Sequence, residues 1–231
     1  MKRFTQYAAF CLIQGLVYLV LALIPVTPLS AANDKFDPVD DHLIPVEYRF
    51  DQSYQKLIST KLFVTRANLQ IVTLPAHATK GESVVALCFE CQATPDTKVT
   101  VTRADRSFWS ATFGQDPKFT KGPAPKISRC DAPIPTPSAE AIFKAVKKMV
   151  NETRPLRNRN NVVILDSTDT VFSIEANGRQ SQGLLTPYAS GKNGAAMRRL
   201  ADLLQQYCAS APSHRAALLK GIETEARNLT Q

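Results

Sequence analysis

Apolar and polar positions alternate in several short runs through the middle of the chain, which is the pattern of β-strands. The most apolar run, Ser83 to Phe89, has apolar residues on both faces and therefore predicts a central strand. Similar runs predict strands over residues 46–50, 61–65, 69–74, 98–103 and 107–113. Turn residues separate these runs, so the pattern favours an antiparallel sheet or a small sandwich.

A second group of short strands is predicted in the C-terminal half. After an apolar run at 162–165, Phe172, Ile174 and Ala176 alternate with polar residues and are expected to face inward. Asn177-Gly178 follows and is a strong hairpin signal, because both residues readily adopt positive φ. The polar run Arg179–Leu185 then suits an edge strand.

Three segments carry apolar residues three and four positions apart, which predicts amphipathic helices. Ser138 and Ser213 are the expected N-caps of the first and the last. The apolar positions of the first helix are Ile142, Phe143, Val146, Met149 and Val150. Those of the second are Met197, Leu200, Ala201, Leu204, Tyr207 and Cys208, and those of the third are Ala217, Leu218, Ile222 and Ala226. The predicted fold class is α+β: a β-rich N-terminal part, then a helix, a short antiparallel meander and two C-terminal helices.

The first 32 residues have the layout of a secretory signal peptide. Met1-Lys2-Arg3 is basic, residues 8–24 are apolar, and Ser30-Ala31-Ala32 offers small residues for cleavage after Ala32. The alternative is an anchor that is kept in the membrane, because the apolar run is near the lower length limit for a span. No other stretch is long and apolar enough to span a membrane. The sequence therefore predicts a periplasmic or secreted protein.

The amino-acid composition predicts a domain boundary within residues 33–231, the part that would remain after cleavage. Residues 114–137 hold six prolines in 24 residues and predict a Pro-rich connector. This boundary gives a β-rich domain over 33–113 and an α+β domain over 138–231. Removing Lys2 and Arg3 lowers the net charge of +8 by 2, to +6. A basic exported chain suits an anionic envelope partner or another protein; nucleic acid is disfavoured, because no aromatic residues interleave the basic clusters.

Four of the five cysteines remain after cleavage: Cys88, Cys91, Cys130 and Cys208. An even number in an exported chain favours disulfides, and four cysteines allow three pairings. The spacing of Cys88 and Cys91 also permits a thiol–disulfide redox site. The downstream turn and strand pattern disfavours it, since redox motifs begin a helix. A zinc site is less supported still, because the three histidines are scattered.

Two anion-binding sites are considered. Lys192 follows Ser190-Gly191 before a helix, but Thr186 replaces the glycine that a complete phosphate loop needs. Arg154, Arg157 and Arg159 form an exposed-looking basic run that could meet phosphate or a glycan.

No hydrolase or metalloprotease template is matched, and no cofactor is predicted. The leading interpretation is a non-catalytic, disulfide-stabilised binding or accessory protein of the cell envelope or secreted fraction. One alternative is a redox protein that uses Cys88 and Cys91. The other is an anion- or glycan-binding protein that uses Arg154, Arg157 and Arg159.

Overall fold

The computed structural model describes residues 41–46, 52–75, 80–89, 97–113, 123–155, 168–187, 189 and 191–231. All of them belong to one compact unit, Phe36–Gln231. The expected export signal, the strand over 162–165 and most of the strand over 46–50 lie outside the described residues, as do Cys91, Arg157 and Arg159. Among the described helices, none combines the length and apolar character needed to cross a membrane.

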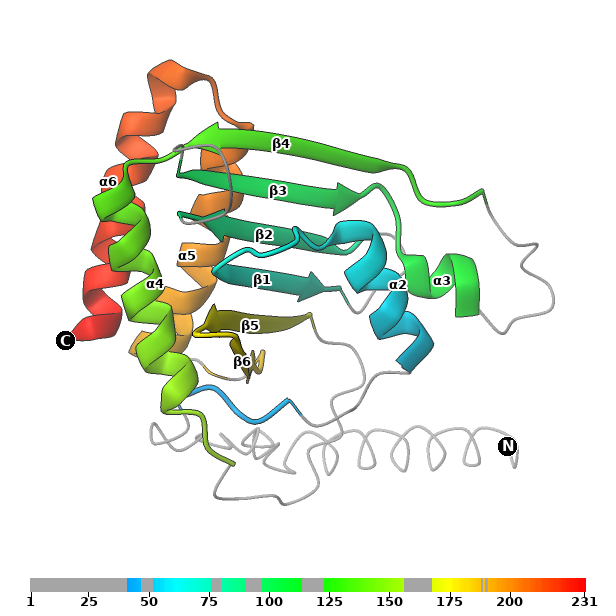
Figure 1. The fold of residues 1–231 in the computed structure, drawn as a ribbon, viewed down its shortest axis with the longest axis horizontal. Helices are drawn as coiled ribbons and strands as arrows, with labels where there is room; N and C mark the ends of the chain where they lie inside the picture. The colour runs from blue at the N-terminus through cyan, green and yellow to red at the C-terminus, as the bar shows by residue number, and fades with distance from the viewer. Residues whose placement is uncertain are drawn as a thin grey trace, which may run out of the picture. The chain divides into compact units, whose positions relative to one another are not determined.

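Six strands form one antiparallel sheet in the order β4-β3-β2-β1-β5-β6 (Figure 1). The strands are β1 (Leu69–Leu74), β2 (Ser83–Cys88), β3 (Lys98–Ala104), β4 (Ile127–Pro133), β5 (Asp169–Ala176) and β6 (Arg179–Leu185). Because β5 pairs with β1, strands from the predicted N-terminal and C-terminal parts lie in the same sheet. The predicted α+β class is confirmed.

The five described helices pack on the two faces of this sheet. They are α2 (Gln52–Leu62), α3 (Phe108–Phe113), α4 (Thr136–Asn151), α5 (Lys192–Ala209) and α6 (Pro212–Thr230). The main core lies between one face and α4, α5 and α6, where Ile71, Val85 and Phe172 meet the apolar stripes predicted for these helices. The apolar stripe predicted for the first of these helices thus packs on the sheet.

The opposite face carries a second, smaller core. Val72, Val84 and Val171 lie side by side in neighbouring strands and pack with Tyr54 of α2 and Phe108 of α3. This explains why all six residues of β2 are buried, as predicted for a central strand. Ser173, one of the polar residues that alternate with Phe172 and Ile174 and would therefore face solvent, is instead 4% exposed, and its hydroxyl accepts a hydrogen bond from Gln180 at 2.8 Å.

The predicted hairpin at Asn177-Gly178 is confirmed. Ala176 pairs with Arg179, and the two residues between them have φ of 52° and 69°. Asparagine and glycine tolerate this left-handed region best, and such turns match the twist of the strands. The polar strand β6 lies at the sheet edge, as predicted.

Two predicted strands are wrong. In the run over 107–113, Phe108–Phe113 form helix α3, and in the run over 61–65, residues 61–62 continue helix α2. Ser107 starts α3, because its Oγ accepts the N–H groups of Trp109 and Ser110 at 3.1 and 3.4 Å. Trp109 therefore does not join a core-facing strand and is 46% exposed.

The two predicted serine caps are also wrong. Each helix starts earlier, at a proline-containing first turn: α4 begins at Thr136 after Pro135, and α6 begins at Pro212. Proline suits these positions because its missing N–H would have no partner within the helix. The hydroxyl of Ser138 instead donates to Glu223 of α6 at 2.7 Å.

The predicted Pro-rich connector over 114–137 contains a regular strand. Residues 127–133 form β4, which pairs with β3 along its whole length. Prolines lie before and at the end of this strand, and α4 begins three residues after it. Residues 127–133 of the expected connector are therefore part of the sheet.

Candidate functional site

The edge strand β4 offers a free row of backbone hydrogen-bonding groups. The N–H of Asp105 donates to Lys126 at 2.9 Å, and that of Ile134 donates to Thr97 at 3.0 Å. Even-numbered residues of this segment thus face β3, because backbone groups alternate in direction along a strand. Ile127, Arg129 and Asp131 direct their N–H and C=O groups away from the sheet, and within the described chain no strand covers them.

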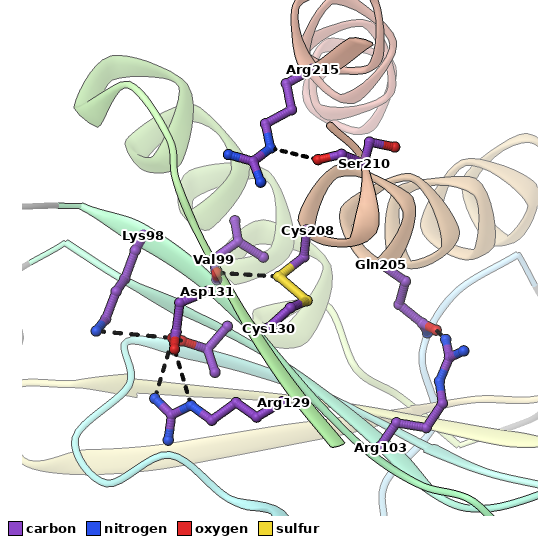
Figure 2. The surroundings of a disulfide bond; sticks show 11 residues. Lys98, Val99, Arg103, Arg129, Cys130, Asp131, Gln205, Cys208, Ser210 and Arg215 are labelled. Carbon is purple, nitrogen blue, oxygen red and sulfur yellow. Dashed lines mark hydrogen bonds and ion pairs between the residues drawn. A yellow bond between two sulfur atoms is a disulfide. The ribbon is translucent and has the colours of Figure 1, made fainter. Parts of the chain in front are cut away.

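Charged side chains accompany this edge. Arg129 contacts Asp131 at 3.2 Å, and Lys98 of β3 lies 3.9 Å from the same carboxylate (Figure 2). Thr100 also donates a hydrogen bond to Asp131, at 2.5 Å. Partial burial acts to raise the pKa of Asp131, but the bonds from Thr100 and Arg129 and the two positive charges outweigh it and lower that pKa. The carboxylate is therefore held in its charged form.

A disulfide fastens β4 to the helical layer. Cys130 of β4 is bonded to Cys208 near the end of α5, across 78 residues of sequence (Figure 2). Cys208 is 3% exposed, and its neighbour Tyr207 donates its hydroxyl to the Pro133 carbonyl at 2.7 Å. Gln205, one turn earlier, accepts a hydrogen bond from Arg103 of β3. The last turns of α5 are thus bonded twice to the edge strand β4 and once to its neighbour β3.

Cys88 is disulfide-bonded as well, and its partner lies outside the described residues. The residue ends β2 and is 5% exposed. A reactive redox cysteine needs access and an electropositive setting. Burial at the end of a central strand is instead the setting of a structural cysteine.

The amino end of α5, where Lys192 was considered for anion binding, already holds a carboxylate. Asp41 accepts the N–H of Asn193 through Oδ2 and that of Gly194 through Oδ1, both at 2.6 Å. A Cβ on Gly191 would lie 2.4 Å from the Asp41 Cγ, so glycine permits this approach. Two of the helix amides on which the predicted anion site at Lys192 depended therefore already have an acceptor.

Asp41→Ala is expected to lower the free energy of unfolding by about 1–2 kcal/mol, because two helix N–H groups lose their acceptor. Denaturant unfolding followed by circular dichroism measures this change. Asp41→Asn is the matched control: it keeps one of the two acceptor oxygens but loses the second and the charge, so its loss should lie between zero and that of Asp41→Ala. An Asp41→Ala protein as stable as the parent would contradict the capping role.

The second predicted anion site is only partly described. Arg154 follows α4, and its backbone joins it to the N-terminal segment: its N–H donates to Leu43 at 3.1 Å, and its carbonyl lies 3.1 Å from the His42 ring. With Arg157 and Arg159 outside the described residues, the cluster stays a prediction. The described residues hold no group of three or more metal-ligating side chains.

Sequence reasoning missed the charged side chain that is most enclosed among the described residues. Glu82 is fully buried beside the second core and accepts hydrogen bonds from Tyr54 Oη at 2.7 Å, Ser107 Oγ at 2.9 Å and the Phe108 N–H at 2.8 Å. Tyr54 also packs edge-to-face on Trp109, with ring centroids 5.3 Å apart. This cluster joins α2, α3 and the start of β2. Its donors come from distant segments, so no local pattern indicates it.

Comparison of the chain with protein-family models, with curated proteins and with solved structures finds no match in any of the three.

Proposed function

We propose that this chain is an exported, disulfide-stabilised binding or accessory protein of the cell envelope or secreted fraction, with no catalytic role of its own. The observation that carries the proposal is the disulfide between Cys130, which is partly buried, and Cys208, which is buried. Cytosolic reductants keep thiols reduced, whereas disulfides persist in the periplasm and outside the cell. A bridge of this kind fits the export signal predicted at residues 1–32.

The β4 edge supports the binding part of the proposal. It combines outward backbone groups with charged side chains, and Arg129 and Asp131 are 49% and 44% exposed. Strand addition to such an edge is a common mode of protein recognition, in which backbone bonds provide affinity and side chains provide specificity. The partner class is another polypeptide. An anionic envelope polymer would instead use the basic side chains of the same region.

A thiol–disulfide activity at Cys88 and Cys91 is the second candidate, because Cys88 is bonded to a cysteine other than Cys130 or Cys208. Its burial favours a structural bond, since exchange requires attack by an external thiolate. The two functions differ in how readily this bond is reduced in the folded protein.

Cell fractionation and cysteine alkylation test the proposal. When the full-length chain is expressed, the protein should be recovered from the periplasmic or secreted fraction. Its amino terminus there should be Asn33, which follows the predicted cleavage site. Alkylating reagent should label none of its cysteines until the protein is both denatured and reduced. Recovery from the cytosol with free Cys130 and Cys208 thiols would refute the proposal. Labelling of Cys88 and Cys91 alone, in folded protein under mild reductant, would support the redox function instead.

A further inference from the structure

The exposed side chains of β4 form a self-complementary series. Ile127, Arg129, Asp131 and Pro133 are alternate residues of one strand and therefore share one face of the sheet. Read from either end, the series runs apolar, charged, charged, apolar, with the two charges opposite in sign. A strand with this pattern can pair with an antiparallel copy of itself.

We propose that two copies of the chain associate through antiparallel pairing of their β4 strands, with Arg129 of each copy opposite Asp131 of the other. This inference names a partner for the β4 edge, so it rests on the binding part of the proposed function and not on export. The result is a two-fold dimer in which the same patch is used on both sides. The two sheets would join edge to edge.

Backbone geometry limits the possible registers. Only odd-numbered residues of β4 present outward N–H and C=O groups, so odd residues must pair with odd residues across the two-fold axis. Placing the axis at Cys130 sets Arg129 opposite Asp131 twice, which gives four backbone hydrogen bonds. Pro133 lacks an N–H, and its carbonyl already accepts Tyr207 Oη, so the ladder ends there.

Charge and apolar surface select this register over its neighbours. With the axis at Arg129, that arginine would face its own copy, and like charges directly opposite are destabilising. With the axis at Cys130, four charges of alternating sign form a square, and Ile127 of each copy lies opposite Pro133 of the other. Ile127 is 44% exposed and, with Trp109, is one of the two exposed large apolar residues in the described part of the chain. The pairing would cover it.

The rest of the edge is compatible with a partner strand. Edge strands are usually protected by charged side chains, proline, bulges or a covering segment. In β4 the two charges are opposite in sign and the proline stands at the last position, so neither feature opposes a second copy of the same strand. The register of β4 with β3 runs without interruption over all seven residues, and five of them are exposed. A single pair of strands buries little area, so the dimer should fall at the weak end of specific interfaces, below about 1,200 Å².

Sedimentation of the full oxidised chain over a wide concentration range tests the pairing. The parent should shift from monomer to dimer as concentration rises, and the shift should weaken with salt because exposed charge pairs are screened. Arg129→Asp alone and Asp131→Arg alone should each weaken self-association at least about tenfold, since each places like charges opposite one another. Circular dichroism and thermal unfolding of each variant show whether the fold is kept.

A mixture of the two single variants provides the decisive control. Arg129→Asp in one chain and Asp131→Arg in the other restore opposite charges at both positions, so a heterodimer should form although neither variant pairs with itself. The double swap in one chain should restore the homodimer. A parent that stays monomeric at every concentration, or a mixture that does not associate, would overturn the proposal. Neither result would alter the fractionation and alkylation outcome that tests export.

Discussion

Removing the Cys130–Cys208 bridge is expected to lower the free energy of unfolding by about 4 kcal/mol. The bond closes a loop of 78 residues, and a cross-link of that span removes much conformational freedom from the unfolded chain. Such a loss approaches half the total stability of an ordinary domain. Denaturant unfolding of a Cys130→Ser, Cys208→Ala protein, followed by circular dichroism, measures it directly.

The single variants are the matched controls for this prediction. Cys130→Ser and Cys208→Ala each break the same bond, so each should lose nearly as much as the double variant. A mild reductant that leaves the disulfide of Cys88 intact should not change the free energy of unfolding of the Cys130→Ser protein. The same reductant should lower the free energy of unfolding of the parent. If the decreases in free energy of unfolding of the two single variants add up to that of the double variant, side-chain packing and not the cross-link determines the effect.

Local sequence patterns were sufficient to predict those strands and turns whose burial or geometry follows from their own residues. The two apolar faces of β2 and the Asn177-Gly178 turn carry their information within a few positions, and both predictions were confirmed. In β5 the strand was confirmed and Phe172 and Ile174 face the main core, but Ser173 is buried as well. The apolar stripes of α4 and α5 were found for the same reason. Core burial depends mainly on side-chain polarity and period, which can be read directly.

The failures come from contacts between residues far apart in the sequence. Residues 107–113 alternate like a strand, yet the Glu82 carboxylate, about 25 positions earlier, accepts the first N–H of a helix there. The prolines around β4 suggested a connector between two domains, but residues 127–133 pair with β3 along their whole length and are bonded to α5 through Cys208. No pattern within either segment contains that information.

The candidate site was only partly predictable for a related reason. Cys130 and Cys208 were singled out by residue type, but their pairing was one of three that the sequence allows. Arg129 and Asp131 were not singled out together, because charged residues near prolines resemble an ordinary solvated surface. Only the register of β4 shows that their backbone groups face outward and that their charges are self-complementary.

Replacing Glu82 with alanine is expected to lower the free energy of unfolding by about 3 kcal/mol. The carboxylate is fully buried and accepts bonds from two hydroxyls and a backbone N–H. Truncation leaves these donors without an acceptor inside the protein, and each buried donor without a partner costs about 1–3 kcal/mol. Denaturant unfolding gives the total, and hydrogen exchange at Phe108 should show that the start of α3 opens first.

A double-mutant cycle separates the hydrogen bonds from the packing of this cluster. Tyr54→Phe removes one donor and should cost about 1 kcal/mol alone. In that background Glu82→Ala should cost less than it does in the parent, because one fewer donor is left without an acceptor. Equal costs in the two backgrounds would contradict the proposed role of the Tyr54–Glu82 bond.

Alkaline pH provides a second test of the same bond. Burial first, and then the hydrogen bond to Glu82 and its negative charge, raise the pKa of Tyr54 above its usual value of 10.0. A group whose pKa is raised on folding stabilises the protein fully below its unfolded pKa, and this contribution is lost as pH rises above that value. Stability should therefore decline above about pH 10. The decline should be shallower in Tyr54→Phe, whereas an unchanged slope would show that Tyr54 ionises as freely in the folded chain as in the unfolded one.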